Sequence, residues 1–192
     1  DMMDRAIELS AALEERLREI PDDARGSWPE GTWTQFSEAE GLKFDLHARV
    51  LSCVLEGGTV EIAAEYRGAQ ACTVVTLEFA QVLPTEITAT STAWPGFLHA
   101  FLGQDIRVNH AGFDSAYIIR ASNPALGRPQ LQRAGLGDAM TEIAAWADEA
   151  RMTARGLEFR VRGFLAEVES LERALNLCRR VARALAGGQY TG

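Results

Sequence analysis

The sequence predicts a single α+β domain in which a mainly antiparallel sheet is covered on one face by helices, including the N-terminal and C-terminal ones. Residues 42–92 alternate apolar and polar side chains between glycine-containing turns, which is typical of strands joined in hairpins. Residues 2–20 and 167–186 instead repeat apolar side chains every three to four positions, as amphipathic helices do. No repeat, low-complexity tract or linker divides the chain, so we expect one domain over 1–192, with 187–192 as a loose tail.

The N-terminal part of the chain is expected to form the first helix, over 2–20. Pro21 ends it, because proline lacks an amide hydrogen. A loop rich in turn residues follows, with Trp28 and Trp33 in or beside it. Such tryptophans either fold back onto the core as a lid or, together with Trp94, line an apolar ligand pocket. The sequence leaves both interpretations open.

Four strands are expected in the next part of the chain. The first, over 44–50, alternates apolar and polar side chains. Glycines mark hairpin turns at 56–59 and 67–70, because glycine reaches the positive φ that tight turns need. The strand over 71–80 is nearly apolar and is expected to be central, whereas the threonine-rich strand over 86–91 is expected at an edge. Short turns between consecutive strands predict an antiparallel meander.

The alternation that follows Gly112 predicts a further strand, which Pro124 ends. Its apolar positions are expected to face the core and its charged positions to point away. These positions are Phe113, Tyr117 and Ile119 on the core side, and Asp114 and Arg120 on the other side.

Helices and a small hairpin are expected in the rest of the chain. A short helix over 94–102 precedes the strand just described, and an irregular stretch rich in glycine and proline follows it. Residues 138–147 predict a helix, and residues 152–161 a hairpin. The closing helix over 167–186 has glutamates in its first turns and arginines in its last, which complements the helix dipole.

The segment 112–124 also carries a family resemblance. It fits the pattern Phe-Asp-x-x-aromatic-hydrophobic-hydrophobic-x-x-Ser-x-Pro, from Phe113 to Pro124, and so resembles a functionally uncharacterised bacterial family. In that family a leucine-rich stretch, a short β-hairpin and a closing helix follow, and the likeness extends over roughly residues 45–186. The family's domain often lies beside membrane-spanning segments. The resemblance implies a domain of unknown function with no catalytic residue to assign.

Composition disfavours several classes of function. The formal charge of −8 disfavours nonspecific binding to nucleic acid or anionic lipid, which needs clustered Lys and Arg. The sequence shows no signal peptide and no apolar run of about 18 residues, so we expect no direct membrane insertion by this chain. Cys53, Cys72 and Cys178 lie far apart in apolar surroundings and predict reduced, buried thiols. We therefore expect a cytoplasmic protein, free or at the inner face of a membrane.

Positive charge gathers near the C-terminus. Residues 151–186 hold eight arginines and four glutamates, for +4, so the remainder carries −12. This pattern indicates either a basic helix end packed beside acidic loops or a docking face. Arg160 and Arg162 are the candidate docking residues, because two positions apart on a strand they share one face, while Phe159 and Val161 face the core. Carboxylates of the chain or of a partner must compensate the two charges.

The sequence predicts no catalytic, cofactor or metal site. His47, His99 and His110 lie on different elements without metal-ligand spacing, and the cysteines form no CxxC pair. His110 and Asp114 could form an acid–base pair, but no nucleophile accompanies them.

These observations favour a non-enzymatic protein-interaction module, a docking or scaffold domain that acts on a partner protein or on a second copy of itself. The alternative is a small-molecule or lipid-binding domain with an apolar pocket between sheet and helices. A third interpretation is a dimer similar to the acidic secretion chaperones of bacteria. A closed apolar cavity would favour the alternative, and a filled core with an exposed patch would favour docking.

Overall fold

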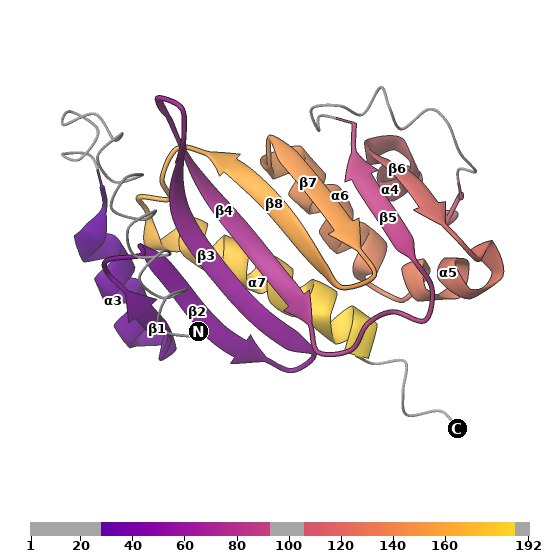
Figure 1. Ribbon diagram of the computed structural model, residues 1–192, viewed down its shortest axis with the longest axis horizontal. Coiled ribbons are helices and arrows are strands. Elements are labelled where there is room, and N and C mark those ends of the chain that lie inside the picture. Colours follow the sequence, from indigo (N-terminus) through magenta and orange to yellow (C-terminus); the bar gives the residue numbers. More distant parts are fainter. Residues whose placement is uncertain (1–27, 93–105, 187–192) are drawn as a thin grey trace, which may run out of the picture.

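The computed structural model describes residues 28–92 and 106–186, which form one eight-stranded sheet with helices packed against it (Figure 1). The strands are β1 (Lys43–Asp45), β2 (Val50–Leu55), β3 (Gly58–Arg67), β4 (Gln70–Phe79), β5 (Ile87–Ser91), β6 (Tyr117–Ala121), β7 (Glu149–Thr153) and β8 (Gly156–Arg162). The helices are α3 (Glu30–Glu40), α4 (Ala111–Ala116), α5 (Pro124–Leu131), α6 (Leu136–Trp146) and α7 (Val168–Ala186). The predicted helices over 2–20 and 94–102 and the predicted tail over 187–192 lie outside the described residues.

Neighbouring strands are antiparallel throughout the sheet, in the order β1-β2-β3-β4-β8-β7-β5-β6. The first four strands form an antiparallel meander, but its members differ from the predicted ones: the predicted strand over 44–50 divides between β1 and β2, and the strand expected over 86–91 does not pair with β4. Instead β8 pairs with the other side of β4, where Leu157 lies opposite Leu77. The edge position expected for the threonine-rich strand is wrong. β5 lies between β6 and β7, with Ala89 opposite both Ile119 and Met152. Its threonines lie on the polar face of a strand that has neighbours on both sides, so they do not mark an edge.

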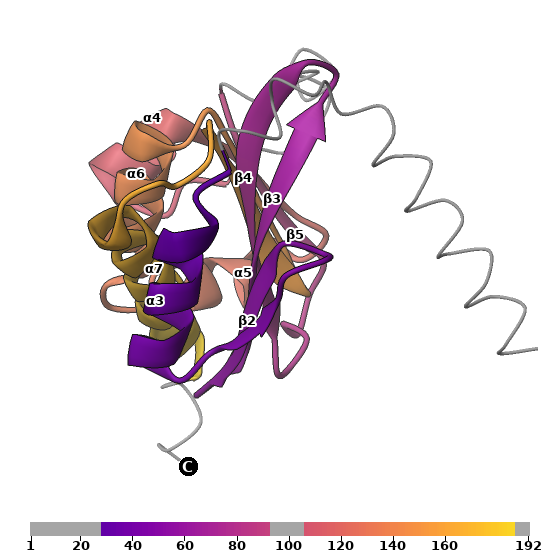
Figure 2. The ribbon, with the colours of Figure 1, turned by 90° about the vertical axis from the view of Figure 1, so that its left-hand side faces the viewer.

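The helices lie on one side of the sheet. Figure 2 shows α3, α4, α6 and α7 against the same face, and none of the described helices covers the opposite face. α5 contacts β6 at the end of the sheet (Figure 1). This arrangement confirms the predicted α+β class, an antiparallel sheet with helices on one face.

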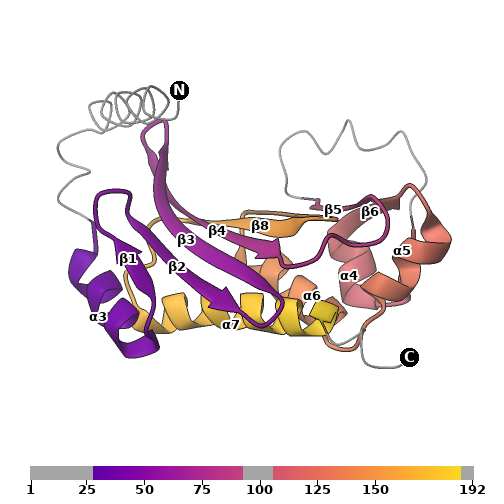
Figure 3. The same cartoon turned by 60° about the horizontal axis from the view of Figure 1, so that its bottom comes forward.

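The closing helix α7 supplies a large part of the core. It runs beneath the sheet along the central strands (Figure 3). Its apolar positions recur every three or four residues, as predicted, and are buried: Leu171, Ala174, Leu175, Leu177, Cys178, Val181, Ala182 and Leu185. They join one hydrophobic cluster with the fully buried Val75, Leu77 and Phe159 of β4 and β8. Burial of each such large side chain is worth about 1.5–3 kcal/mol relative to exposure.

The segment predicted as one strand after Gly112 divides into the helix α4 and the strand β6. The difference is caused by a polar turn, which the alternation of apolar and polar residues does not reveal. Nδ1 of His110 accepts a hydrogen bond from the amide of Phe113 (3.1 Å) and thereby caps the helix. The carboxylate of Asp114 accepts hydrogen bonds from the amides of Val108 (2.8 Å) and His110 (3.2 Å). Asp114 therefore closes a turn instead of pointing away from a strand.

The apolar side chains of the same segment face the core as expected. Phe113, Tyr117 and Ile119 are buried. The rings of Phe113 and Tyr117 meet edge to face with centroids 5.1 Å apart, and the Tyr117 hydroxyl donates to the carbonyl of Met140 on α6 (3.0 Å). Helix and strand thus bury the same three residues that a continuous strand would bury.

Besides α4, two further helices were not predicted. α3 begins just after Trp28, in a stretch expected to be a loop, and buries Trp33 and Phe36 against the core. α5 occupies the stretch expected to be irregular. It forms because the Asn123 side chain accepts hydrogen bonds from the first amides of the helix and Pro124 suits its first position.

The strand expected over 44–50 is interrupted by a turn. Oδ1 of Asp45 accepts a hydrogen bond from the amide of Ala48 (2.9 Å), and Arg49 has a φ of 55°. The chain therefore reverses between β1 and β2, which pair with each other. Aspartate side chains favour such turns because they compete with the strand ladder for backbone amides.

The turn between β2 and β3 packs directly on α7. Gly57 there has a φ of 95°, and a Cβ added to it would lie 2.9 Å from the carbonyl oxygen of Ala182. A side chain at this position would therefore push the hairpin away from the helix. The hairpin itself was predicted correctly.

The cysteines are all free thiols, as predicted. Cys178 is fully buried on α7, and burial raises the pKa of its thiol. Cys53 and Cys72 are only half-buried, which differs from the prediction, although burial still raises the pKa of both thiols.

Substitution of Phe113 and Asp114 tests the turn at α4. Phe113→Ala is expected to lower the free energy of unfolding by about 3–5 kcal/mol, because it empties a fully buried aromatic site. Asp114→Ala is expected to lower it by about 1–3 kcal/mol, because two amides lose their acceptor. Urea unfolding measures both changes. The exposed neighbour Ser115, changed to Ala, is the control, and a loss from Asp114→Ala no larger than the control's would contradict the role of the turn.

Candidate docking surface

The open face is the side of the sheet opposite α7. Its side chains come from alternate strand positions whose intervening neighbours are mostly buried. They are largely polar: Glu61, Glu65 and Arg67 on β3, Thr76 and Glu78 on β4, Glu158, Arg160 and Arg162 on β8, Glu149 and Arg151 on β7, and Thr88 and Thr90 on β5. The open face is therefore a polar surface on a rigid sheet.

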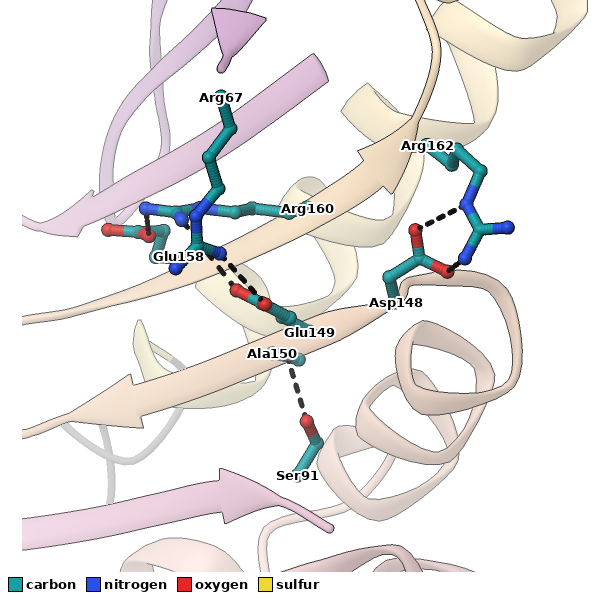
Figure 4. A network of polar contacts seen from close by, with 8 residues as sticks. All are labelled: Arg67, Ser91, Asp148, Glu149, Ala150, Glu158, Arg160 and Arg162. Atoms are coloured by element: carbon teal, nitrogen blue, oxygen red, sulfur yellow. Dashed lines mark hydrogen bonds and ion pairs between the residues drawn. The ribbon is translucent and has the colours of Figure 1, made fainter. Parts of the chain in front are cut away.

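A charged strip lies on the open face where β3 and β8 end and β7 begins, and it consists of Arg67, Asp148, Glu149, Glu158, Arg160 and Arg162 (Figure 4). Glu149 lies at its centre, with Oε1 3.0 Å from Nη1 of Arg67 and Oε2 3.6 Å from Nη1 of Arg160. Arg160 lies directly opposite Glu149 in the β7–β8 ladder and donates from Nη2 to Oε1 of Glu158 (2.9 Å). The Glu149 side chain is only 12% exposed, so the two arginines supply the polar contacts that water would otherwise make.

The second part of the charged strip is more exposed. Nε of Arg162 lies 3.3 Å from Oδ2 of Asp148, and the two side chains are 73% and 48% exposed. Ion pairs in such solvated positions contribute about 0–1 kcal/mol to stability. Arg162 and Asp148 therefore present ordered charges to solvent without holding the fold together.

Backbone contacts fix the position of the strip. The amide of Asp148 donates to the carbonyl of Arg160 (2.8 Å), and the amide of Ala150 donates to Oγ of Ser91 (3.0 Å). Ser91 is buried on β5, so its hydroxyl ties the start of β7 to the neighbouring strand (Figure 4). The carboxylates of Asp148 and Glu149 are thus held beside β8 by the sheet itself.

The two predicted docking residues, Arg160 and Arg162, lie on one face of β8, with Phe159 and Val161 buried on the other. Carboxylates of the same chain accompany both guanidinium groups. Sequence reasoning missed these carboxylates, because the strand that positions Glu149 begins earlier than the predicted hairpin. The charged strip contains three arginines and three carboxylates, so it is electrically balanced.

The predicted pocket tryptophans lie at another place in the fold. Trp33 is fully buried and donates from Nε1 to the carbonyl of Leu165 (2.8 Å). Trp28 packs on Trp33 with ring centroids 4.7 Å apart, and Arg49 lies over its ring. Trp94 lies outside the described residues. Trp28 and Trp33 thus cover one end of the core.

His110 is committed to structural contacts. Its Nδ1 accepts the capping hydrogen bond of α4, which leaves the proton of the neutral ring on Nε2, 3.0 Å from Oδ1 of Asp138. Gly137 makes room for the ring, since a Cβ there would lie 2.4 Å from it. The conceivable acid–base pair of His110 and Asp114 is not formed, because Asp114 contacts the backbone amide of His110 and not its ring. Over residues 28–92 and 106–186, no three His, Cys, Asp or Glu side chains gather as a metal site would require.

The arginines of α7 pair mainly with acidic residues of neighbouring helices. Arg179 lies 2.8 Å from Glu40 of α3, and both Arg173 and Arg180 approach Glu142 of α6. The excess of positive charge in 151–186 therefore matches a basic helix end packed beside acidic elements. Within the described ranges, Arg183 makes no ion pair.

Comparison with known proteins shows a similarity of fold. A crystal structure of the mycobacterial trehalose monomycolate transport factor A is similar to this chain with a TM-score of 0.51. The two chains are 11% identical, and the match covers 82% of this chain and 94% of the transport factor. No protein-family model and no curated protein matches the sequence. Among the helices in the described ranges, none has the length and apolar character needed to cross a membrane.

Replacement of Glu149 and Asp148 compares the two parts of the charged strip. Glu149→Ala is expected to lower the free energy of unfolding by about 1–3 kcal/mol, because the largely buried Glu149 carboxylate is the shared partner of Arg67 and Arg160, and its loss leaves Arg160 with Glu158 as its remaining carboxylate. Asp148→Ala is expected to change it by about 0–1 kcal/mol, because the pair with Arg162 is solvated. Urea unfolding of the two variants checks the order. Equal losses would mean that Glu149 does not organise the strip.

Proposed function

We propose that the protein is a non-enzymatic docking module that presents the open face of its sheet to a protein partner. The observation that carries the proposal is the charged strip, whose guanidinium and carboxylate groups are already paired with one another on the open face of the sheet. Ordered side chains lose less conformational entropy on association than free ones do, so such a surface is suited to binding.

The balance of charges in the strip indicates the chemistry of the partner. A surface with three cations and three anions matches a partner that also carries both signs, and it offers little to a uniformly anionic polymer such as nucleic acid. A second copy of the chain meets this requirement, because an isologous interface pairs the same surface with itself. The third sequence-based interpretation, a dimer similar to secretion chaperones, is the version of the proposal in which the partner is this second copy.

The proposal that the protein is not an enzyme is supported by the structural roles of side chains that could otherwise act in catalysis. Both ring nitrogens of His110 are engaged, and Cys178 is buried beneath the sheet. The structural neighbour is named as a transport factor, and a docking domain within a transport assembly agrees with that name. We propose a cytoplasmic location, with the resemblance to domains found beside membrane segments favouring the inner face of a membrane.

The ligand-binding alternative required an apolar cavity between sheet and helices. Among the described residues that space is filled by the hydrophobic cluster around α7. Trp28 and Trp33, the described members of the predicted pocket, pack on the core. The filled core favours docking over a ligand site of that kind.

Photo-crosslinking in the native host tests the docking proposal. A photoreactive amino acid at Thr76, beside the strip, is expected to give an adduct of defined mass. The same amino acid at the exposed Glu172 of α7 is the matched control and is expected to give none. An adduct of twice the chain's own mass would identify a second copy as the partner. Equal labelling from both positions would contradict the proposal.

A charge swap separates docking from stability. Arg162→Glu is expected to reduce the adduct on the order of fivefold or more while leaving the melting temperature nearly unchanged, because Arg162 is exposed. Combining Arg162→Glu with Asp148→Arg restores the internal ion pair with inverted polarity and is expected to keep the adduct low. Full recovery of the adduct in the double variant would show that the pair acts only within the fold.

A further inference from the structure

A cavity of about 540 Å³ opens at the end of the sheet, away from the charged strip. The last turn of α7, the β2–β3 turn, the segment after β4 and the connection from α5 to α6 meet around it. The volume lies within the range of about 300–1,000 Å³ that is typical of small-molecule sites. Neither Trp28 nor Trp33 lines it. The sequence gives no local sign of the cavity, because four separate segments form it.

One part of the cavity wall is apolar. Phe79 at the end of β4, Leu83 and Pro84 in the following segment, and Leu185 at the end of α7 contribute to it. Val82 also lines the cavity and is 61% exposed. These residues offer apolar surface to a ligand that brings an apolar body.

The other part of the wall carries polar groups that the fold leaves largely unused. Arg133 donates to the carbonyl of Leu185 and makes no ion pair within the described ranges, and burial lowers the pKa of its guanidinium, which stays charged at neutral pH. Arg183 also lacks an ion pair there, unlike Arg173, Arg179 and Arg180 of the same helix.

We propose that this cavity binds an anionic amphiphile, a small molecule with an apolar body and one carboxylate or phosphate head group. Arg133 and Arg183 receive the head group, since the planar fork of a guanidinium matches both oxyanions. The apolar wall contacts the body. Glu56 is the one carboxylate on the lining, against two guanidinium groups, so the lining favours an anion over a cation.

The proposed cavity site is independent of the docking proposed for the open face. The cavity is lined by the helix α7 and by the ends of strands, and it shares no residue with the charged strip. Substitutions at the cavity are therefore expected to leave the photo-crosslinks at Thr76 unchanged.

Titration calorimetry with the full chain tests the cavity. Dodecanoate and dodecyl phosphate, each below its micelle concentration, are the probes, and dodecyltrimethylammonium is the probe of opposite charge. Binding of at least one anionic probe with one-to-one stoichiometry is expected, and the tighter of the two identifies the head group. Binding of neither anionic probe, or equal binding of the cationic probe, would overturn the proposal.

Substitutions test whether the probe binds in the cavity. Arg183→Gln is expected to lower the affinity for the more tightly bound anionic probe about tenfold or more, because a charge-assisted hydrogen bond is lost. Arg151→Gln, which removes an exposed arginine from the open face, is the matched control and is expected to leave the affinity unchanged. Circular dichroism establishes that both variants are folded. An unchanged affinity in Arg183→Gln, or an equal loss in both variants, would show that the probe binds elsewhere.

Discussion

The burial of the apolar stripe of α7 under the central strands is the interaction on which the rest of the structure depends. The stripe covers the inner faces of β3 and β4 and contacts α3 and α6. Because α7 occupies the helical side of the sheet, the opposite side carries mostly polar positions, with exceptions such as Val54 of β2, which is 84% exposed. The polarity of the open face is thus a consequence of where the last helix packs. The same helix places Arg183 and Leu185 at the mouth of the cavity.

Elements with a strong local pattern could be predicted from the sequence. The period of α7, the glycine turns of the meander and the alternation of β8 each depend on residues close together in the chain. The helix α5 could not be predicted, because the cap from Asn123 stands among the turn signals of Pro124, Gly127 and Pro129. The helix α3 has no side-chain cap that could mark its start. The division at α4 depends on His110 and Asp114 together, and alternation of apolar residues is the same with or without that turn.

The candidate site was predictable to a smaller extent. A period of two places Arg160 and Arg162 on one face of a strand, and this is visible in the sequence. The identity of their carboxylate partners depends on which strand lies beside β8 and in which register. Glu149 pairs with Arg160 because β7 begins at that residue, and no local signal marks this beginning. Similarly, the arginines of α7 meet Glu40 and Glu142 from helices that lie far earlier in the chain.

The pairing of β4 with β8 has a consequence for the order of folding. The meander from β1 to β4 consists of neighbouring hairpins, so its contacts are local and can form early. The outer edge of β4, however, is completed only by β8, and in between the chain must build β5, β6 and β7. During synthesis the largely apolar β4 therefore presents an unpaired edge, which is the kind of surface that promotes aggregation. The β4–β8 pairing at the middle of the sheet is therefore expected to form late in folding.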